Sequence, residues 1–261
     1  MKIALVGYGK MGHMIEQCAL RAGHEVVVTI DSFAKDASCL IPQNDSSALC
    51  RAVKSSGAEG IIEFTHPSSV VENIKALLPL GLPLVVGTTG WNDKHTEIAE
   101  FAKQVGGTIM TAGNFSIGVN MFYKIVEEAA KIMSEYKDYD VAVWEAHHNQ
   151  KADSPSGTAL EIARRVMNGY SSKTQIVTDA FHERPQSNQL HVSSTRCGNI
   201  PGTHKVFFDG TADTIEITHT ARSREGFADG AVECLSKLDN CLKTGKLQKG
   251  NLYDWKDVME K

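Results

Sequence analysis

Up to about residue 115, segments with the hydrophobic pattern of a strand alternate with segments that have the hydrophobic period of a helix. Short aliphatic runs predict five strands, at residues 3–6, 26–30, 61–64, 84–86 and 108–111. Between these runs apolar side chains recur every three or four residues, which is typical of helices with one buried face. One such helix covers residues 11–22 and ends at Gly23, and another begins at Ser69, where Glu72 predicts a capping box. Strands separated by helices predict an α/β fold, a Rossmann doubly wound parallel sheet.

The pattern changes after Asn114. A long helix near residues 117–134 is expected to turn one apolar set inward, namely Met121, Ile125, Val126, Ala129, Ile132 and Met133. Later strand-like runs lie at residues 141–145, 189–195, 204–208 and 215–219, and Asp209-Gly210 predicts a hairpin turn. We therefore expect a smaller α+β domain at residues 118–225. Residues 1–117 are expected to form the first domain, which the C-terminal residues 226–261 rejoin through an amphipathic helix.

Composition and charge exclude several classes of protein. The net charge is −4 without a basic run, which argues against a nucleic-acid partner. No stretch approaches the ~20 apolar residues of a membrane span, and the N-terminal apolar run is too short for a signal peptide. The 6 cysteines lack a CxxC pair or metal-ligand spacing, so they are expected to be reduced thiols. We expect a cytoplasmic protein without a membrane partner.

A glycine-rich turn follows the first strand and opens the first helix. It reads Gly7-Tyr8-Gly9-Lys10-Met11-Gly12, the GxGxxG pattern of dinucleotide-binding proteins. The first glycine makes the turn, the second admits a pyrophosphate, and the third lets helix and strand pack closely. Asp31, at the end of the second strand, is expected to accept hydrogen bonds from the adenosine ribose. Asp31 favours NADH because it would repel a 2′-phosphate, whereas Lys35 could offset that charge and admit NADPH.

Two further loops follow predicted strands and are expected at the carboxyl edge of the sheet, where ligands bind in this fold. They are Gly87-Thr88-Thr89-Gly90 and Ala112-Gly113-Asn114-Phe115. Their small residues would let a flat nicotinamide ring approach the backbone, and their amide and hydroxyl groups could bond its carboxamide. The alternative is that both are ordinary turns, since glycine, threonine and asparagine are common there.

The segment from Glu145 to Ala159 (EAHHNQKADSPSGTA) carries the most chemistry. His147 and His148 are adjacent, Lys151 follows, and Ser156-Gly157-Thr158 begins a predicted helix whose N–H groups could hold a carboxylate. Adjacent histidines suit a tetrahedral metal site poorly, so we expect no metal. A lone histidine is usually structural. Here two histidines lie near a lysine and an anion site in a chain that is expected to bind a dinucleotide, and this combination favours acid–base catalysis.

These motifs together resemble the dihydrodipicolinate reductase family, also called 4-hydroxy-tetrahydrodipicolinate reductases. The resemblance covers the whole chain and includes ITHTARSREGFADGA at residues 217–231. It implies that His147 gives or takes a proton, that Lys151 is the other acid group, and that His148 contacts substrate. It also implies that Gly157 and Thr158 hold a substrate carboxylate.

The resemblance further implies an NAD(P)H-dependent oxidoreductase of lysine and diaminopimelate biosynthesis that acts on a small dicarboxylate and forms a homotetramer. The chain departs from the family in its shorter glycine turn, with Lys10 in place of an arginine, and at Cys197, Pro201 and Thr203. The alternatives are another NAD(P)-dependent dehydrogenase on the same fold and a non-catalytic dinucleotide sensor. The sequence leaves the choice between NADH and NADPH open.

Overall fold

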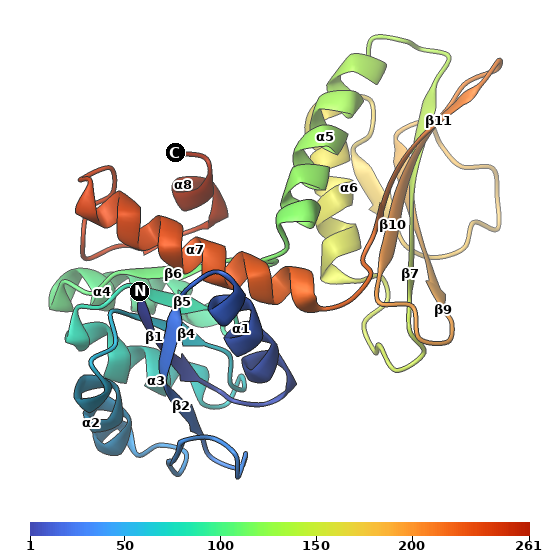
Figure 1. Cartoon of the computed structure of the whole chain (residues 1–261). Coiled ribbons are helices and arrows are strands. Elements are labelled where there is room, and N and C mark those ends of the chain that lie inside the picture. Colours follow the sequence, from blue (N-terminus) through green and yellow to red (C-terminus); the bar gives the residue numbers. More distant parts are fainter. The chain divides into compact units, whose positions relative to one another are not determined.

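The computed structural model describes all of residues 1–261 and contains two units, each with its own sheet (Figure 1). Unit 1 comprises Met1–Ser116 and Glu225–Lys261, and unit 2 comprises Ile117–Arg224. No helix in either unit has both the length and the apolar character needed to cross a membrane.

Unit 1 is built on a parallel sheet of seven strands in the order β12-β6-β5-β4-β1-β2-β3. The strands are β1 Lys2–Val6, β2 Glu25–Asp31, β3 Cys39–Leu40, β4 Gly60–Glu63, β5 Leu84–Val86, β6 Ile109–Thr111 and β12 Leu252–Tyr253. The helices are α1 Lys10–Arg21, α2 Ser46–Ser56, α3 Val70–Leu77, α4 His95–Val105, α7 Glu225–Lys243 and α8 Trp255–Met259, with short 3₁₀ turns at Leu78–Leu80 and Asn92–Lys94.

Alternate residues of the central strands enter two different cores. Ile3 and Leu5 pack with α1, α7 and α8 on one face, whereas Ala4 and Val6 pack with α2, α3 and α4 on the other. Successive side chains of a strand point to opposite faces, so one short aliphatic run can serve both cores. Helices on both faces of a parallel sheet confirm the predicted doubly wound fold.

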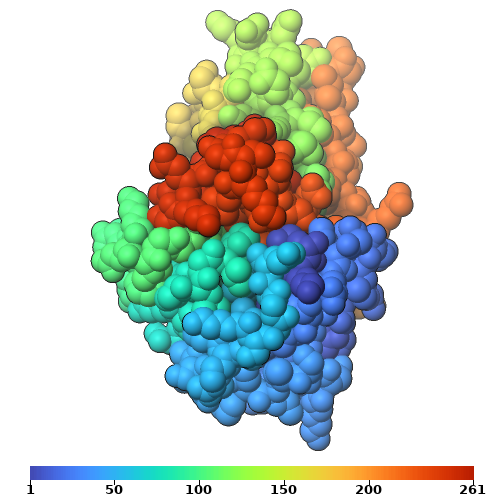
Figure 2. Space-filling model, turned by 60° about the vertical axis from the view of Figure 1, so that its left-hand side comes forward, coloured from blue at the N-terminus to red at the C-terminus, as the bar shows by residue number.

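The C-terminal helix α7 returns to unit 1 although unit 2 precedes it in the chain. It contacts α1, β4 and β5, and its buried residues include Ala231, Cys234 and Leu235. Figure 2 shows the C-terminal segment, in red, lying directly on the blue and teal first part of the chain.

Unit 2 is a mixed five-stranded sheet in the order β11-β10-β7-β9-β8, with two helices packed against it. Its strands are β7 Asp140–His147, β8 Gln175–Val177, β9 Gln189–Arg196, β10 Thr203–Asp209 and β11 Thr214–Thr220, and its helices are α5 Ile117–Met133 and α6 Gly157–Gly169. β10 and β11 pair antiparallel, as the turn at Asp209-Gly210 predicted.

Two local predictions were wrong. Met121, Ile125 and Ile132 of α5 are 39%, 55% and 56% exposed, because this helix is apolar on two faces and buries the one that carries Phe122, Val126 and Ala130. Ser69 does precede α3 as its N-cap residue, but its hydroxyl donates to Thr65 Oγ1 and to the His66 carbonyl and does not cap the helix.

Candidate functional site

The glycine-rich turn joins β1 to α1 in a conformation that only glycine can supply. Gly7 has a φ of +96°, and a Cβ there would lie 2.0 Å from the carbonyl oxygen of Phe64. A Cβ at Gly12 would lie 2.3 Å from the oxygen of Gly7, so α1 can pack this closely only without a side chain. A Cβ at Gly9 meets nothing within 4 Å. The protein itself therefore does not crowd Gly9, and the open space there suits the approach of a ligand to the backbone.

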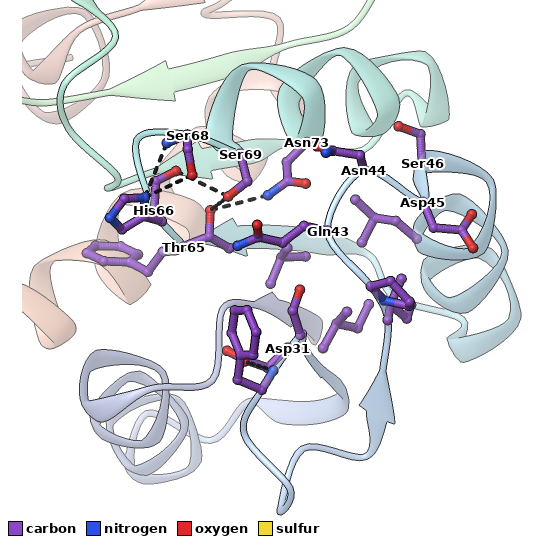
Figure 3. A pocket seen from close by; sticks show the side chains of 18 of the residues that line it. Asp31, Gln43, Asn44, Asp45, Ser46, Thr65, His66, Ser68, Ser69 and Asn73 are labelled. Carbon is purple, nitrogen blue, oxygen red and sulfur yellow. Dashed lines mark hydrogen bonds between the residues drawn. The ribbon is translucent and has the colours of Figure 1, made fainter.

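The amino end of α1 meets the requirements of an anion site. Gly9 is its N-cap residue and has no side chain, so the N–H groups of the first turn carry no side-chain cap. A cavity of about 490 Å³ lies beside it, and its wall includes Gly9, Asp31 and Asn73 (Figure 3). Lys10 is exposed next to the turn, and Met11 is half-buried against the core.

Asp31 ends β2 beside this cavity, as expected. Its Oδ2 accepts the Tyr8 N–H at 2.7 Å, and its Oδ1 accepts the N–H groups of Phe33 at 2.7 Å and Ala34 at 2.9 Å. Burial alone would raise the pKa of this carboxyl, but the backbone donors outweigh it and hold the pKa low. Asp31 thus ties the glycine turn to the next loop, and its Oδ2, which accepts the Tyr8 N–H, keeps a second lone pair for a ribose hydroxyl.

Phe64 brings together the loops that were predicted to flank the nicotinamide. A Cβ at Gly87 would lie 1.8 Å from the Phe64 ring, and the Phe115 ring is centred 6.0 Å from it. Its carbonyl also packs against Gly7. Segments 87–90 and 112–115 therefore meet beside the glycine turn. Thr89 and Gly113 are exposed, and Asn114 accepts a hydrogen bond from the Ser116 N–H.

The Thr88 hydroxyl is engaged within the protein, contrary to the expectation that it could bond a carboxamide. It donates to Glu63 Oε2 at 2.7 Å and accepts the N–H of Thr65 at 2.7 Å. Thr88 is 7% exposed. We infer that it shapes its loop and that a ligand would meet the backbone of this loop and its exposed neighbour Thr89.

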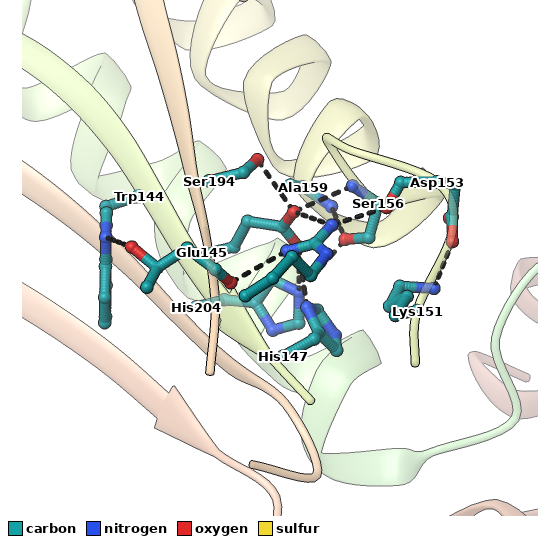
Figure 4. A network of polar contacts seen from close by, with 11 residues as sticks. Trp144, Glu145, His147, Lys151, Asp153, Ser156, Ala159, Ser194 and His204 are labelled. Atoms are coloured by element: carbon teal, nitrogen blue, oxygen red, sulfur yellow. Dashed lines mark hydrogen bonds and ion pairs between the residues drawn. The ribbon is translucent and has the colours of Figure 1, made fainter. Parts of the chain in front are cut away.

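In unit 2, His147 is the last residue of β7 and lies against a fully buried carboxylate. Its Nδ1 is 2.9 Å from Oε2 of Glu145, two residues earlier on the same face of the strand (Figure 4). The His147 side chain is 9% exposed and that of Glu145 is 0% exposed. A carboxylate beside Nδ1 favours a proton on that nitrogen and leaves Nε2 for other chemistry.

The other oxygen of Glu145 is held by three donors. Oε1 accepts from Ser156 N at 2.9 Å, Ser194 Oγ at 2.8 Å and Arg196 Nη2 at 2.9 Å. Although burial opposes ionisation, the neighbouring His147 and the hydrogen bonds from Ser156 and Arg196 hold the pKa of Glu145 far below its usual range. A buried anion fixed in this way can orient the His147 ring.

His204 adds a second buried imidazole to this cluster. It lies opposite Glu145 on β10, its Nε2 is 3.8 Å from Glu145 Oε2, and its ring meets that of His147 edge-on at 5.1 Å. Burial, and then the neighbouring His147, lower the pKa of His204 to about 3, so it is neutral at physiological pH. Glu145, His147 and His204 each offer one atom within 4.8 Å of the others, a spacing that could also suit a metal ion. However, the Arg196 guanidinium already balances the carboxylate, which disfavours a second cation there.

The remaining predicted residues follow His147 on the loop to α6. Lys151 Nζ pairs with Asp153 Oδ1 at 2.7 Å and points toward that carboxylate, not toward His147 (Figure 4). His148 is half-buried, Gly157 is exposed and Thr158 is half-buried at the start of α6.

Ser156 differs from the expectation that it would present free donors to a carboxylate. Its N–H donates to Glu145, and its hydroxyl accepts from Ala159 N at 3.1 Å as the N-cap of α6. A carboxylate bound at this helix would therefore meet residues after Ser156.

Sequence reasoning missed the partners of His147. Glu145 alternates with it on one strand, and that period-2 spacing was a usable signal. Arg196 and His204 reach the site only through strand pairing, which the sequence does not show. Phe33 was also missed. It follows Asp31, is 77% exposed and lines the cavity, where its ring could stack on a flat base.

Comparison with known proteins gives the family. Residues 1–115 match the dihydrodipicolinate reductase N-terminus, and residues 118–259 match the dihydrodipicolinate reductase C-terminus. The chain belongs to the dihydrodipicolinate reductase family. It is 35% identical over 259 residues to a 4-hydroxy-tetrahydrodipicolinate reductase of Christiangramia forsetii, with 99% of this chain and 98% of that protein covered. The corresponding enzyme of Archaeoglobus fulgidus is 34% identical over 274 residues, and both chains are covered fully (100%).

Solved structures give the same fold. A dipicolinate-bound dihydrodipicolinate reductase from Paenisporosarcina sp. TG-14 superposes with a TM-score of 0.74 at 20% identity, over 98% of both chains. The predicted family and the predicted α/β fold with a second mixed sheet are therefore both confirmed.

Proposed function

We propose that this protein reduces 4-hydroxy-tetrahydrodipicolinate to tetrahydrodipicolinate with NADH or NADPH, with loss of the 4-hydroxyl group as water, in lysine and diaminopimelate biosynthesis. The family match over the whole chain supports this reaction, and relatives named for it are about one-third identical over that length. The observation in the structure that carries the proposal is the buried Glu145–His147 pair, which is suited to proton transfer.

The residues of unit 1 fit a dinucleotide. The open backbone at Gly9, the uncapped end of α1 and the adjoining cavity suit a pyrophosphate and its nucleoside. Gly7, Tyr8, Lys10, Met11, Gly12 and Asp31 form or border this site, and residues 87–89 and 112–115 would flank the nicotinamide. When bound, the reduced nicotinamide supplies the hydride.

His147 is the proposed proton donor. Glu145 holds the Nδ1 proton, so the proton that moves to the ring nitrogen of the substrate, where negative charge develops, is the Nε2 proton of the imidazolium, and its transfer leaves a neutral ring. Gly202 leaves room there, because a Cβ at this position would lie 3.0 Å from His147 Nε2.

Unit 2 is proposed to bind the carboxylates of the substrate and to form the contacts between subunits. Gly157 and Thr158 at the start of α6 would hold one carboxylate, and His148 with Lys151 would contact the other. Because Lys151 is paired with Asp153, the substrate and Asp153 would share the same ammonium group. The homotetramer and the cytoplasmic location remain predictions.

The test is oxidation of NADH or NADPH, followed by nicotinamide absorbance, with substrate made in situ from pyruvate and aspartate semialdehyde by the preceding synthase. We expect rapid oxidation that requires the synthase. Cofactor binding without oxidation would contradict the proposal and favour a dinucleotide sensor or another dehydrogenase.

A further inference from the structure

A second fully buried carboxyl group lies in unit 1, outside the chemistry assigned so far. Glu63 is the last residue of β4 and pairs with Val6 of β1 on one side and with Val86 of β5 on the other. It is 0% exposed, in a position where a parallel sheet normally carries an aliphatic side chain. Burial raises the pKa of this carboxyl, although hydrogen bonds from Thr65, Thr88 and Asn73 oppose the shift.

The two oxygens of Glu63 serve two different loops. Oε1 accepts from the Thr65 hydroxyl and from Asn73 Nδ2 at 3.2 Å, in the segment between β4 and α3. Oε2 accepts from Thr88 Oγ1 at 2.7 Å, in the segment after β5. The N–H of Thr65 closes the ring by donating to Thr88 Oγ1 at 2.7 Å.

This network borders the cofactor site on both sides. Thr65 and Asn73 line the cavity beside Gly9, and Asn73 and Ser69 also donate to Thr65 Oγ1 (Figure 3). Thr88 belongs to the loop proposed to flank the nicotinamide. A buried carboxyl group costs folding energy unless it is satisfied, and apolar packing at such positions is often at least as stable. Its presence here therefore needs a reason other than stability.

We propose that Glu63 is a positioning residue for the cofactor: by joining the Thr65 and Thr88 segments, it places the residue 87–90 loop where the nicotinamide half binds. This inference rests on the proposed function of that loop. Glu63 acts through Thr88 and contacts no reacting atom.

The test is the Glu63→Gln variant, which keeps the shape of the side chain. Only one oxygen remains, so one of the two loops loses its acceptor whichever way the amide turns. Binding of NADH and of ADP-ribose, which lacks the nicotinamide, is measured by titration calorimetry. We expect NADH affinity to fall about tenfold, as for loss of a buried hydrogen bond, and ADP-ribose affinity to stay within about twofold.

Thr108→Val is the matched control. Thr108 is 3% exposed at the amino end of β6, and its hydroxyl accepts the Gly250 N–H at 3.2 Å. The variant removes a comparable buried hydrogen bond at the opposite edge of the same sheet, so it should lower the melting temperature and leave both affinities unchanged.

Thr88→Val removes the hydrogen bond between Thr88 and Glu63 by changing the donor. It tests the proposal if Glu63→Gln does not fold. It should also weaken NADH selectively, and the double variant should lose no more than the worse single variant. Equal losses of NADH and ADP-ribose, or no loss of either, would overturn the proposal. Failure of the wild-type protein to bind ADP-ribose would instead contradict the proposed cofactor site.

Discussion

Replacing His204 tests how the buried cluster around His147 depends on protonation. His204 is 4% exposed, and burial together with the neighbouring His147 lowers its pKa to about 3. In the unfolded chain a histidine has a pKa of about 6.5. At a pH between these two pKa values, this histidine binds a proton in the unfolded state but not in the folded state. The free energy of unfolding therefore falls as the pH falls.

The size of the effect follows from the two pKa values. Each pH unit below about 6.5 lowers the free energy of unfolding by about 1.4 kcal/mol, so the decrease from pH 7 to pH 5 is about 2 kcal/mol. In the His204→Gln variant this loss should disappear. Other histidines whose pKa is shifted, such as His24 and His219, titrate equally in both proteins and cancel in the comparison.

The assay is urea unfolding at pH 7 and pH 5, followed by the fluorescence of Trp144 in β7 of unit 2, with the contributions of Trp91 and Trp255 removed by substitution with phenylalanine. Wild type should lose about 2 kcal/mol more than His204→Gln over this interval. His182→Gln, at an exposed position, should behave like wild type. An equal pH dependence in wild type and His204→Gln would refute the reasoning.

Three further predictions concern catalysis and the cofactor. Glu145→Gln should lower kcat at least about tenfold, because the His147 ring loses the carboxylate that orients it; an unchanged kcat would argue against the pair. Asp31→Ala should raise KM for NADH more than for NADPH, since it removes a ribose acceptor that also repels a 2′-phosphate; equal changes would exclude Asp31 from cofactor choice. Dialysis against EDTA should leave the rate unchanged, and a loss reversed by zinc would show instead that Glu145, His147 and His204 hold a metal ion.

Periodicity predicted the five central strands of unit 1 and the helices α1, α3 and α7, because each buries a face that local spacing reveals. The two-residue strands β3 and β12 are too short to show a period, and they were not predicted. The same logic failed at α5, where Met121 and Ile125 belong to a second apolar face that the protein leaves exposed. Spacing reports that a face is apolar and does not say which face the core will cover.

The site residues could be predicted by type but not by partner. Thr88 and Ser156 carry the donors expected of ligand-binding groups, yet Glu63 and Glu145 use them within the fold. His204 reaches the site because β10 pairs with β7. Such contacts depend on strand order and register, which the sequence of one segment does not contain.

The most direct test of the central claim is the kcat of His147→Ala for NAD(P)H oxidation with synthase-generated substrate, measured beside the affinity of the same variant for cofactor. We expect kcat to fall about 10²- to 10⁴-fold while cofactor affinity stays near that of wild type, because unit 1 alone supplies the proposed cofactor site. Near-normal turnover in this variant would contradict the assignment of His147 as the proton donor.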